Sequence, residues 1–126
     1  MKNINICIAG LGNVGASLIK SIENNNHFFQ NKTKLKFNIV GISAKSKNKK
    51  RIIDISNYDW FDDPIEMAKL NNCDVVVELI GQEKGLSYDL IELALKNKKN
   101  VVTANKALIA NHGTNLFKLA EINSLA

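Results

Sequence analysis

The fold is decided by residues 4–15, INICIAGLGNVG. Ile4–Ala9 is a short apolar run rich in isoleucine, which predicts a buried strand. Gly10, Gly12 and Gly15 follow at the spacing G-x-G-x-x-G, and apolar residues then recur at helical spacing over Ala16–Glu23. The stretch therefore predicts a strand, a tight glycine turn and a helix in direct succession.

Apolar runs and helical patterns alternate along the rest of the chain. Strands are predicted over Leu35–Ile42, Asp74–Ile80 and Asn100–Thr103. Helices are predicted from an Asp63 cap to about Leu70, from a Ser87 cap to Lys96, and over Thr114–Ile122. Asn24–Lys34 is predicted to be a polar connection, and Ile52–Trp60 an irregular or short-strand segment. This alternation predicts an α/β fold, a doubly wound parallel sheet of the Rossmann-like kind, with strand order 3-2-1-4 counted along the chain.

The composition indicates one ordinary globular domain. The chain has 126 residues, 45% of them hydrophobic, and 17 Lys and Arg against 12 Asp and Glu give a net charge of +5. Much of the positive charge lies in the segment KSKNKKR, residues 45–51. Only 6% of the residues are aromatic, and no helix-turn-helix, zinc-finger or aromatic RNA-binding signature is present. Nucleic-acid binding is therefore disfavoured.

The sequence favours a cytoplasmic protein without a metal site. It has no signal-peptide pattern and no apolar run of the ~20 residues needed to cross a membrane. Cys7 and Cys73 lie in or beside apolar runs, where buried thiols are expected and a disulfide framework is not. His27 and His112 have no partners at metal-ligand spacing, so surface or loop roles are favoured for them.

The glycine motif is suited to a dinucleotide. In a doubly wound sheet, ligands bind outside the carboxyl ends of the strands, where the strand order reverses. A glycine turn there lets a pyrophosphate approach the backbone, and the following helix start offers free N–H groups and a partial positive charge. A purely structural glycine turn is the alternative. The position of Gly10–Gly15 between a strand and a helix favours dinucleotide binding.

The end of the second predicted strand favours NADP over NAD. An acid usually stands there and accepts hydrogen bonds from the adenosine ribose, but this chain has Ile42-Ser43-Ala44-Lys45 followed by further basic residues. Ser43 and Lys45 are the candidates for contact with the ribose or its 2′-phosphate. A solvated lysine loop is the alternative, and it is favoured for the later lysines.

One charged residue lies within the third predicted strand, and another follows the fourth. Glu78 lies within an apolar run, so it is either a functional carboxylate facing the cleft or a structural group with hydrogen-bond partners, because an unpaired buried charge is costly. Lys106 comes directly after Asn100–Thr103. A lysine at that position could orient a carbonyl, donate a proton or hold a cofactor ribose.

Three segments carry a resemblance to a known family. They are AGLGNVG (residues 9–15), DVVVELIG (74–81) and NVVTANKALIA (100–110), and WFDDP (60–64) adds to them. On these residues the chain resembles the N-terminal cofactor-binding domain of homoserine dehydrogenase over essentially its whole length. Within the last segment, TANKAL (residues 103–108) is far more specific for this family than the glycine motif.

The resemblance implies an NADP- or NAD-dependent oxidoreductase that interconverts L-homoserine and L-aspartate 4-semialdehyde, on the route to threonine, isoleucine and methionine. It implies that Leu11–Val14 hold the pyrophosphate, that Lys45 meets the adenosine ribose or its phosphate, and that residues 79–81 approach the nicotinamide. It makes Lys106 the candidate catalytic residue. The candidate cofactor-binding residues are Gly10, Leu11, Gly12, Asn13, Val14, Gly15, Ser43, Lys45, Leu79, Ile80, Gly81 and Lys106.

The chain departs from the family pattern in two respects. Gln82 stands where the family usually has a second glycine, so the loop after the third strand is expected to differ. The family's substrate domain, which carries acidic substrate ligands and a second lysine, is absent. Residues 1–126 are therefore expected to be the NAD(P)-binding domain of a longer enzyme, inactive alone and homodimeric at full length. An aspartate dehydrogenase and a non-catalytic dinucleotide-sensing module are the alternatives, and TANKAL argues against both.

Overall fold

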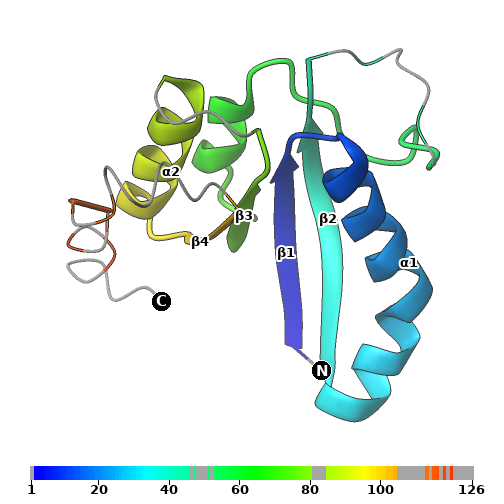
Figure 1. Cartoon of the computed structure of the whole chain (residues 1–126). Helices are drawn as coiled ribbons and strands as arrows, with labels where there is room; N and C mark the ends of the chain where they lie inside the picture. The colour runs from blue at the N-terminus through cyan, green and yellow to red at the C-terminus, as the bar shows by residue number, and fades with distance from the viewer. Residues whose placement is uncertain are drawn as a thin grey trace.

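The computed structural model describes residues 2–45, 47, 51, 53–80, 85–104, 113, 115, 116, 118 and 120. Within these residues a parallel sheet of four strands, in the order β2-β1-β3-β4, has helices on both faces (Figure 1). The elements in chain order are β1 (Lys2–Ala9), α1 (Asn13–Thr33), β2 (Leu35–Ser43), the 3₁₀ helix η1 (Pro64–Lys69), β3 (Val75–Glu78), α2 (Leu86–Lys96) and β4 (Asn100–Thr103).

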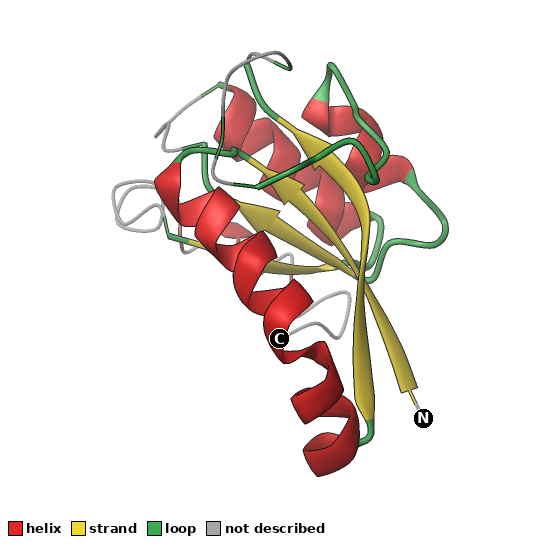
Figure 2. Ribbon diagram, turned by 90° about the vertical axis from the view of Figure 1, so that its right-hand side faces the viewer, coloured by secondary structure: helices red, strands yellow, loops and turns green. Residues whose placement is uncertain are grey.

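The two faces of the sheet are buried in two separate cores. Successive residues of β1 contribute side chains to the two cores in turn, because the side chains of a strand point alternately to opposite faces. Ile6 and Ile8 pack in the core beneath α1, whereas Cys7 and Ala9 pack in the core beneath η1 and α2. Figure 2 shows the long helix α1 in front of the strands and the shorter helices behind them. The apolar run of β1 is therefore covered on both sides, as in a doubly wound sheet.

The predicted α/β fold with a parallel sheet is confirmed, but the predicted strand order 3-2-1-4 is wrong. The third strand along the chain, β3, pairs with β1, where Cys7 lies opposite Val76. The outer side of β2 instead meets Trp60 through a single parallel bridge to Ile42. The bridged residue Trp60 thus takes the place expected for the third strand. A single bridged residue leaves no strand pattern in the sequence. The order reverses between β1 and β3.

The polar connection predicted over residues 24–34 is also wrong, since α1 continues to Thr33. Asparagines are weak helix formers, and this half of the helix has no apolar periodicity that would reveal it. Tertiary bonds hold it: the Asn26 side chain donates to the Phe37 carbonyl (3.0 Å) and accepts from the Phe37 N–H (3.2 Å). The helix ends at Thr33, and its C-cap residue Lys34 has a φ of 59°, in the left-handed region.

The remaining elements lie close to their predicted positions. Asp63 caps η1 as expected, through the Ile65 N–H, although the helix is 3₁₀. Gly85 is the N-cap of α2, so Ser87 is buried inside the helix and is not its cap. Of the predicted helix over Thr114–Ile122, the described positions 115, 116, 118 and 120 are helical. Leu116 and Ala120 pack against α2.

Candidate functional site

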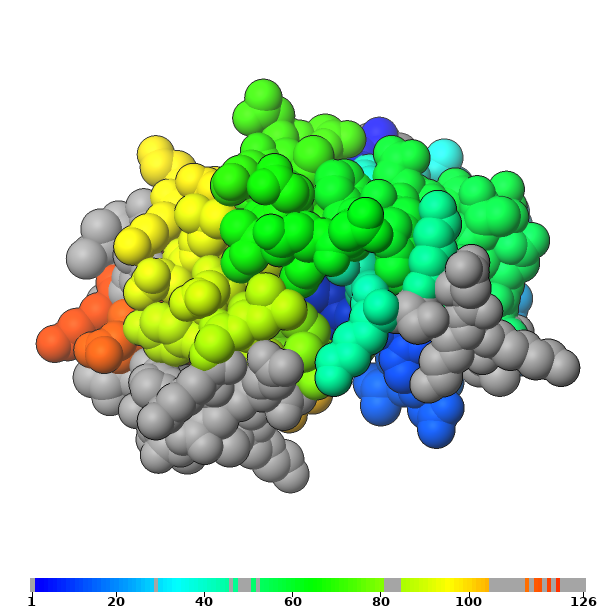
Figure 3. Space-filling model, turned by 90° about the horizontal axis from the view of Figure 1, so that it is seen from above, coloured from blue at the N-terminus to red at the C-terminus, as the bar shows by residue number. Residues whose placement is uncertain are grey.

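The last residues of the four described strands lie in one row across the sheet. Ser43 of β2 is opposite Ala9 of β1, Ala9 is opposite Glu78 of β3, and Glu78 is opposite Thr103 of β4. The segments after this row meet around a pocket of about 370 Å³. Seen from above, the space-filling surface is hollowed there, and blue atoms of the first strand and glycine turn form its floor (Figure 3).

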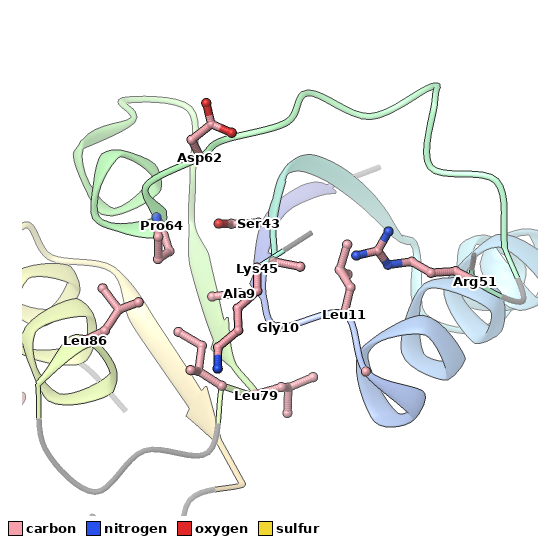
Figure 4. Close-up of a pocket in the computed structure, with 13 residues that line it drawn as sticks. Ala9, Gly10, Leu11, Ser43, Lys45, Arg51, Asp62, Pro64, Leu79 and Leu86 are labelled. Carbon is pink, nitrogen blue, oxygen red and sulfur yellow. The ribbon is translucent and has the colours of Figure 1, made fainter. Parts of the chain in front are cut away.

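The pocket brings together seven of the predicted cofactor-binding residues. They are Gly10, Leu11, Gly12, Ser43, Lys45, Leu79 and Ile80. Ala9, Ala44, Arg51, Asp62, Pro64 and Leu86 complete the lining, and Figure 4 shows residues from the β1, β2 and β3 ends facing those of η1 and α2. Asn13, Val14 and Gly15 are in the first turn of α1 and do not line the pocket.

The glycine turn is packed so closely that two of its positions have no room for a side chain. Gly10 has φ of +106°, and a Cβ there would lie 2.7 Å from the backbone carbonyl of Leu79. A Cβ on Gly15 would lie 2.0 Å from the carbonyl oxygen of Gly10. The Gly10 N–H donates to the Ser43 carbonyl, and the Leu79 N–H donates to the Ala9 carbonyl, both at 2.8 Å. The turn is thus fixed to β2 on one side and to the end of β3 on the other.

The start of α1 faces this pocket without a capping side chain. Gly12 is the N-cap residue, it makes no side-chain hydrogen bond, and the first turn contains no acid. A Cβ on Gly12 would meet nothing within 4 Å. The first N–H groups of a helix lack partners inside the helix and carry a partial positive charge. Open space and these donors together form a place suited to a phosphate.

The β2 side of the pocket is basic. Ser43 is buried, and Lys45 is exposed at the pocket edge. Arg51, later in the same segment, extends toward Leu11 in Figure 4. Its guanidinium lies 5.9 Å from the centre of the Trp60 ring and donates to the Lys47 carbonyl at 3.2 Å. These contacts hold a second cation at the pocket.

The opposite side is formed by the loop after β3. Leu79 and Ile80 are half-buried and line the pocket. Glu78, immediately before them, is completely buried and accepts hydrogen bonds from the Ile80 N–H (3.0 Å) and the Thr103 hydroxyl (2.8 Å). Its carboxylate thus has structural partners and does not line the pocket. Gly81, Gln82 and Lys106 lie outside the described residues.

Sequence reasoning missed several lining residues. Arg51 was grouped with a solvated basic loop, and its stacking on Trp60 depends on the bridge between that segment and β2. The Trp60 indole N–H donates to the Asp62 side chain at 2.8 Å, so the position of Asp62 at the pocket depends on the same bridge. Leu86 reaches the pocket only because α2 packs beside β3. Neither Arg51 nor Leu86 is marked by a local pattern, whereas Asp62 lies in the WFDDP segment beside the Asp63-Pro64 cap.

Other candidate residues have roles outside the pocket. Cys7 and Cys73 are buried free thiols, and the hydrogen bond between them, with burial, raises the pKa of Cys7, while the same bond lowers the pKa of Cys73. Burial and the neighbouring Glu23 carboxylate raise the pKa of Tyr58. His27 is exposed and contacts Asn31, and His112 lies outside the described residues. In the described part of the chain, no cluster of three metal-ligating side chains and no helix able to span a membrane is found.

Comparison with known proteins identifies the family. Residues 10–125 match the model of the homoserine dehydrogenase NAD-binding domain. This chain belongs to that family. The chain is 37% identical over 120 residues to the homoserine dehydrogenase of Pseudomonas aeruginosa, covering 95% of this chain and 27% of that protein. The alternatives of an aspartate dehydrogenase and a non-catalytic sensing module are not favoured by these matches.

Solved homoserine dehydrogenase structures share the fold. The Staphylococcus aureus enzyme at pH 8.5 superposes with a TM-score of 0.92 at 40% identity, over 100% of this chain and 31% of that one. A mutant homoserine dehydrogenase from a hyperthermophilic archaeon, in complex with NADPH, matches with a TM-score of 0.78 at 22% identity, over 97% of this chain and 42% of that one. The chain therefore spans between about a quarter and two-fifths of the length of these homoserine dehydrogenases.

Proposed function

We propose that this chain binds NADP in preference to NAD at the carboxyl edge of its sheet, as the cofactor domain of a homoserine dehydrogenase. The observation that carries dinucleotide binding is the uncapped start of α1, which faces the pocket with open space at Gly12. The preference for NADP is argued from Ser43 and Lys45 at the end of β2. Membership of the NAD-binding domain family supports it. The archaeal relative solved with NADPH supports the choice of cofactor class.

The pyrophosphate would lie against the glycine turn. Gly10 and Gly15 keep the turn tight, and the backbone N–H groups of Leu11, Gly12, Asn13 and Val14 would face the phosphates. The exposed Asn13 and Val14 side chains do not contribute to the pocket lining, so we assign these two residues a backbone role.

The adenosine half would lie on the basic β2 side. Ser43 and Lys45 would contact the ribose and its 2′-phosphate, and Arg51 would add a second cation. The described residues at the end of β2 include no acid that would repel a 2′-phosphate, because Ser43, Ala44 and Lys45 stand there. A charge-assisted contact with a phosphate is among the stronger hydrogen bonds, which supports preference for NADP.

The nicotinamide half would then extend toward β3 and β4. Leu79, Ile80 and Gly81 would border it, and Lys106 would serve as the catalytic residue at the substrate, as the resemblance implies. When bound, the cofactor supplies or accepts the hydride that interconverts L-homoserine and L-aspartate 4-semialdehyde. The chain's own part is to hold the pyrophosphate, bind the adenosine phosphate and orient the ring, which lowers the entropic cost of hydride transfer.

We further propose that residues 1–126 are one domain of a longer enzyme, homodimeric and cytoplasmic, whose substrate domain binds these small molecules. The chain's coverage of 27% of its Pseudomonas relative supports the first point. The buried free thiols of Cys7 and Cys73 support a reducing compartment.

The test is a calorimetric titration of the chain with NADPH and NADH at fixed salt. We expect NADPH to bind more tightly. Lys45→Ala should weaken NADPH about tenfold and NADH less than about twofold, because only NADPH carries the 2′-phosphate.

Lys47→Ala is the matched control, since Lys47 is an exposed lysine of the same segment that does not line the pocket. It should leave both affinities unchanged. Tighter binding of NADH by the unaltered chain would contradict the NADP preference, and absence of binding by both would contradict the proposed function.

A further inference from the structure

Glu78 is a buried carboxylate that the proposed function leaves without a role. It ends the otherwise apolar strand β3, and its exposed fraction is 0%. A buried carboxylate is costly unless it is hydrogen bonded, whereas a hydrophobic residue at the end of this apolar strand would carry no such cost. The carboxylate at this position therefore suggests a task other than core packing.

The hydrogen bonds of Glu78 connect two strand ends at the edge of the pocket. Oε1 accepts from the Ile80 N–H (3.0 Å), two residues along the same segment, and fixes the turn of the chain after β3. Oε2 accepts from the hydroxyl of Thr103, the last residue of β4 and its partner in the strand register (2.8 Å). One side chain thus sets the position of the β3 loop relative to the end of β4.

The same loop rests on the glycine turn. Leu79 donates its N–H to the Ala9 carbonyl, and its own carbonyl is so close to Gly10 that a Cβ there would be 2.7 Å away. A shift of the loop would therefore change the shape of the pocket at Leu79 and Ile80, both of which line it. The two hydrogen bonds of Glu78 with Ile80 and Thr103 do not involve Lys45.

We propose that Glu78 is a positioning residue for the nicotinamide half of the dinucleotide, acting through the backbone of Ile80 and through Thr103. This inference rests on the proposed function. A dinucleotide lies across the point where the strand order reverses, which is between β1 and β3. With its adenosine on the basic β2 side and its pyrophosphate at α1, the other half meets the loop that Glu78 holds.

The test compares two ligands that differ only in the nicotinamide ring, NADPH and 2′-phospho-ADP-ribose, by calorimetry on the whole chain. Glu78→Leu removes both acceptors without burying a new polar group. It should weaken NADPH about tenfold and the ring-free fragment less than about twofold. Glu78→Gln should restore NADPH binding to within about threefold, because its carbonyl can accept from Ile80 and its amide can donate to the Thr103 oxygen.

Thr103→Val provides an independent variant of nearly the same volume. It should weaken NADPH about fivefold and leave the fragment unchanged. If Glu78→Leu does not fold, this variant alone decides. Asn26→Ala is the control for general destabilisation, since Asn26 also makes two hydrogen bonds with a strand, yet with Phe37 at the start of β2. It should lower the melting temperature and keep both affinities within about twofold.

Equal loss of NADPH and fragment binding in Glu78→Leu would overturn the inference, because it would show a structural role alone. Unchanged NADPH binding in that variant would overturn it as well. In both cases the unaltered chain still binds, and the proposed function stands. If the unaltered chain binds neither ligand, the proposed function and this inference both fail.

Discussion

The starts of α1 and η1 border the same pocket, but a side chain caps the backbone N–H groups only at η1. At η1 the Asp63 side chain accepts from the Ile65 N–H (3.0 Å), Pro64 has no N–H to satisfy, and Glu66 adds an acid to the first turn. At α1 the cap residue is Gly12, without a side chain, and the first turn has no acid.

The difference supports the proposed phosphate site at the start of α1. A helix that carries its own carboxylate at its start has already satisfied the donors and the partial positive charge of that end. The start of α1 leaves both available, and its tight packing at Gly10 and Gly15 is achieved without filling the space at Gly12. The start of η1 is therefore capped by the chain itself, whereas the start of α1 has no capping side chain, as expected if a ligand's phosphates complete that helix end.

The largest expected effect is on folding, from Gly15→Ala. The added Cβ would lie 2.0 Å from the Gly10 carbonyl oxygen, so the turn or the helix must move. We expect a loss of roughly 3 kcal/mol or more in the free energy of unfolding, measured by urea denaturation. Gly12→Ala is the control, with nothing within 4 Å of its Cβ, and should cost about 1 kcal/mol or less. Equal losses in the two variants would show that the turn is not closely packed.

The second expected effect is on binding, from Gly12→Asp. This change gives α1 the acidic cap that η1 has, so the melting temperature should stay the same or rise. The new carboxylate would face the phosphates, and NADPH affinity should fall at least about thirtyfold in a calorimetric titration. Gly12→Asn caps without a charge and should lose much less. A Gly12→Asp variant that binds NADPH normally would show that the phosphates do not lie at α1.

The third expected effect is on η1, from Asp63→Ala. Loss of the cap should reduce the free energy of unfolding by about 1 kcal/mol, because the Ile65 N–H loses its partner. NADPH affinity should stay within about twofold, since this helix end is not assigned to the ligand. Asp63→Asn retains an acceptor and should recover most of the stability. A large fall in affinity for Asp63→Ala with stability retained would mean that η1 takes part in binding.

The elements that the sequence predicted well are those with a strong local signal. Ile4–Ala9 and the glycines after it predicted β1, the turn that follows it and the start of α1. The run of valines predicted β3. The second half of α1 was missed because the bonds between Asn26 and Phe37 that hold it are tertiary. The strand order was predicted wrongly because the place expected for the third strand, beside β2, is taken by Trp60 through one bridge.

The same division applies to the candidate site. The sequence could place Gly12, Ser43 and Lys45 at the pocket because a doubly wound sheet brings its loops to one edge, whichever strands are neighbours. Arg51 and Leu86 reach the pocket through packing between segments distant in sequence, which no spacing rule contains. The two readings left open for Glu78 could be separated only by its partners, Ile80 and Thr103.

The smallest expected effect concerns Asp54, which repeats the arrangement of Asp63 on an exposed turn. Its Oδ1 accepts from the Ser56 N–H (2.9 Å), and this bond, with a further one from the Ser56 side chain, lowers the pKa of Asp54 from its ordinary 3.8. A lowered pKa in the folded state adds stability above the unfolded pKa, and that stability is lost as the pH falls through the folded one. NMR titration should give a midpoint below 3.8. Ser56→Ala should move it only partly back, because the backbone donor remains. A midpoint at or above 3.8 would show that accepting a backbone N–H does not stabilise this carboxylate, and would weaken the same argument for Asp63.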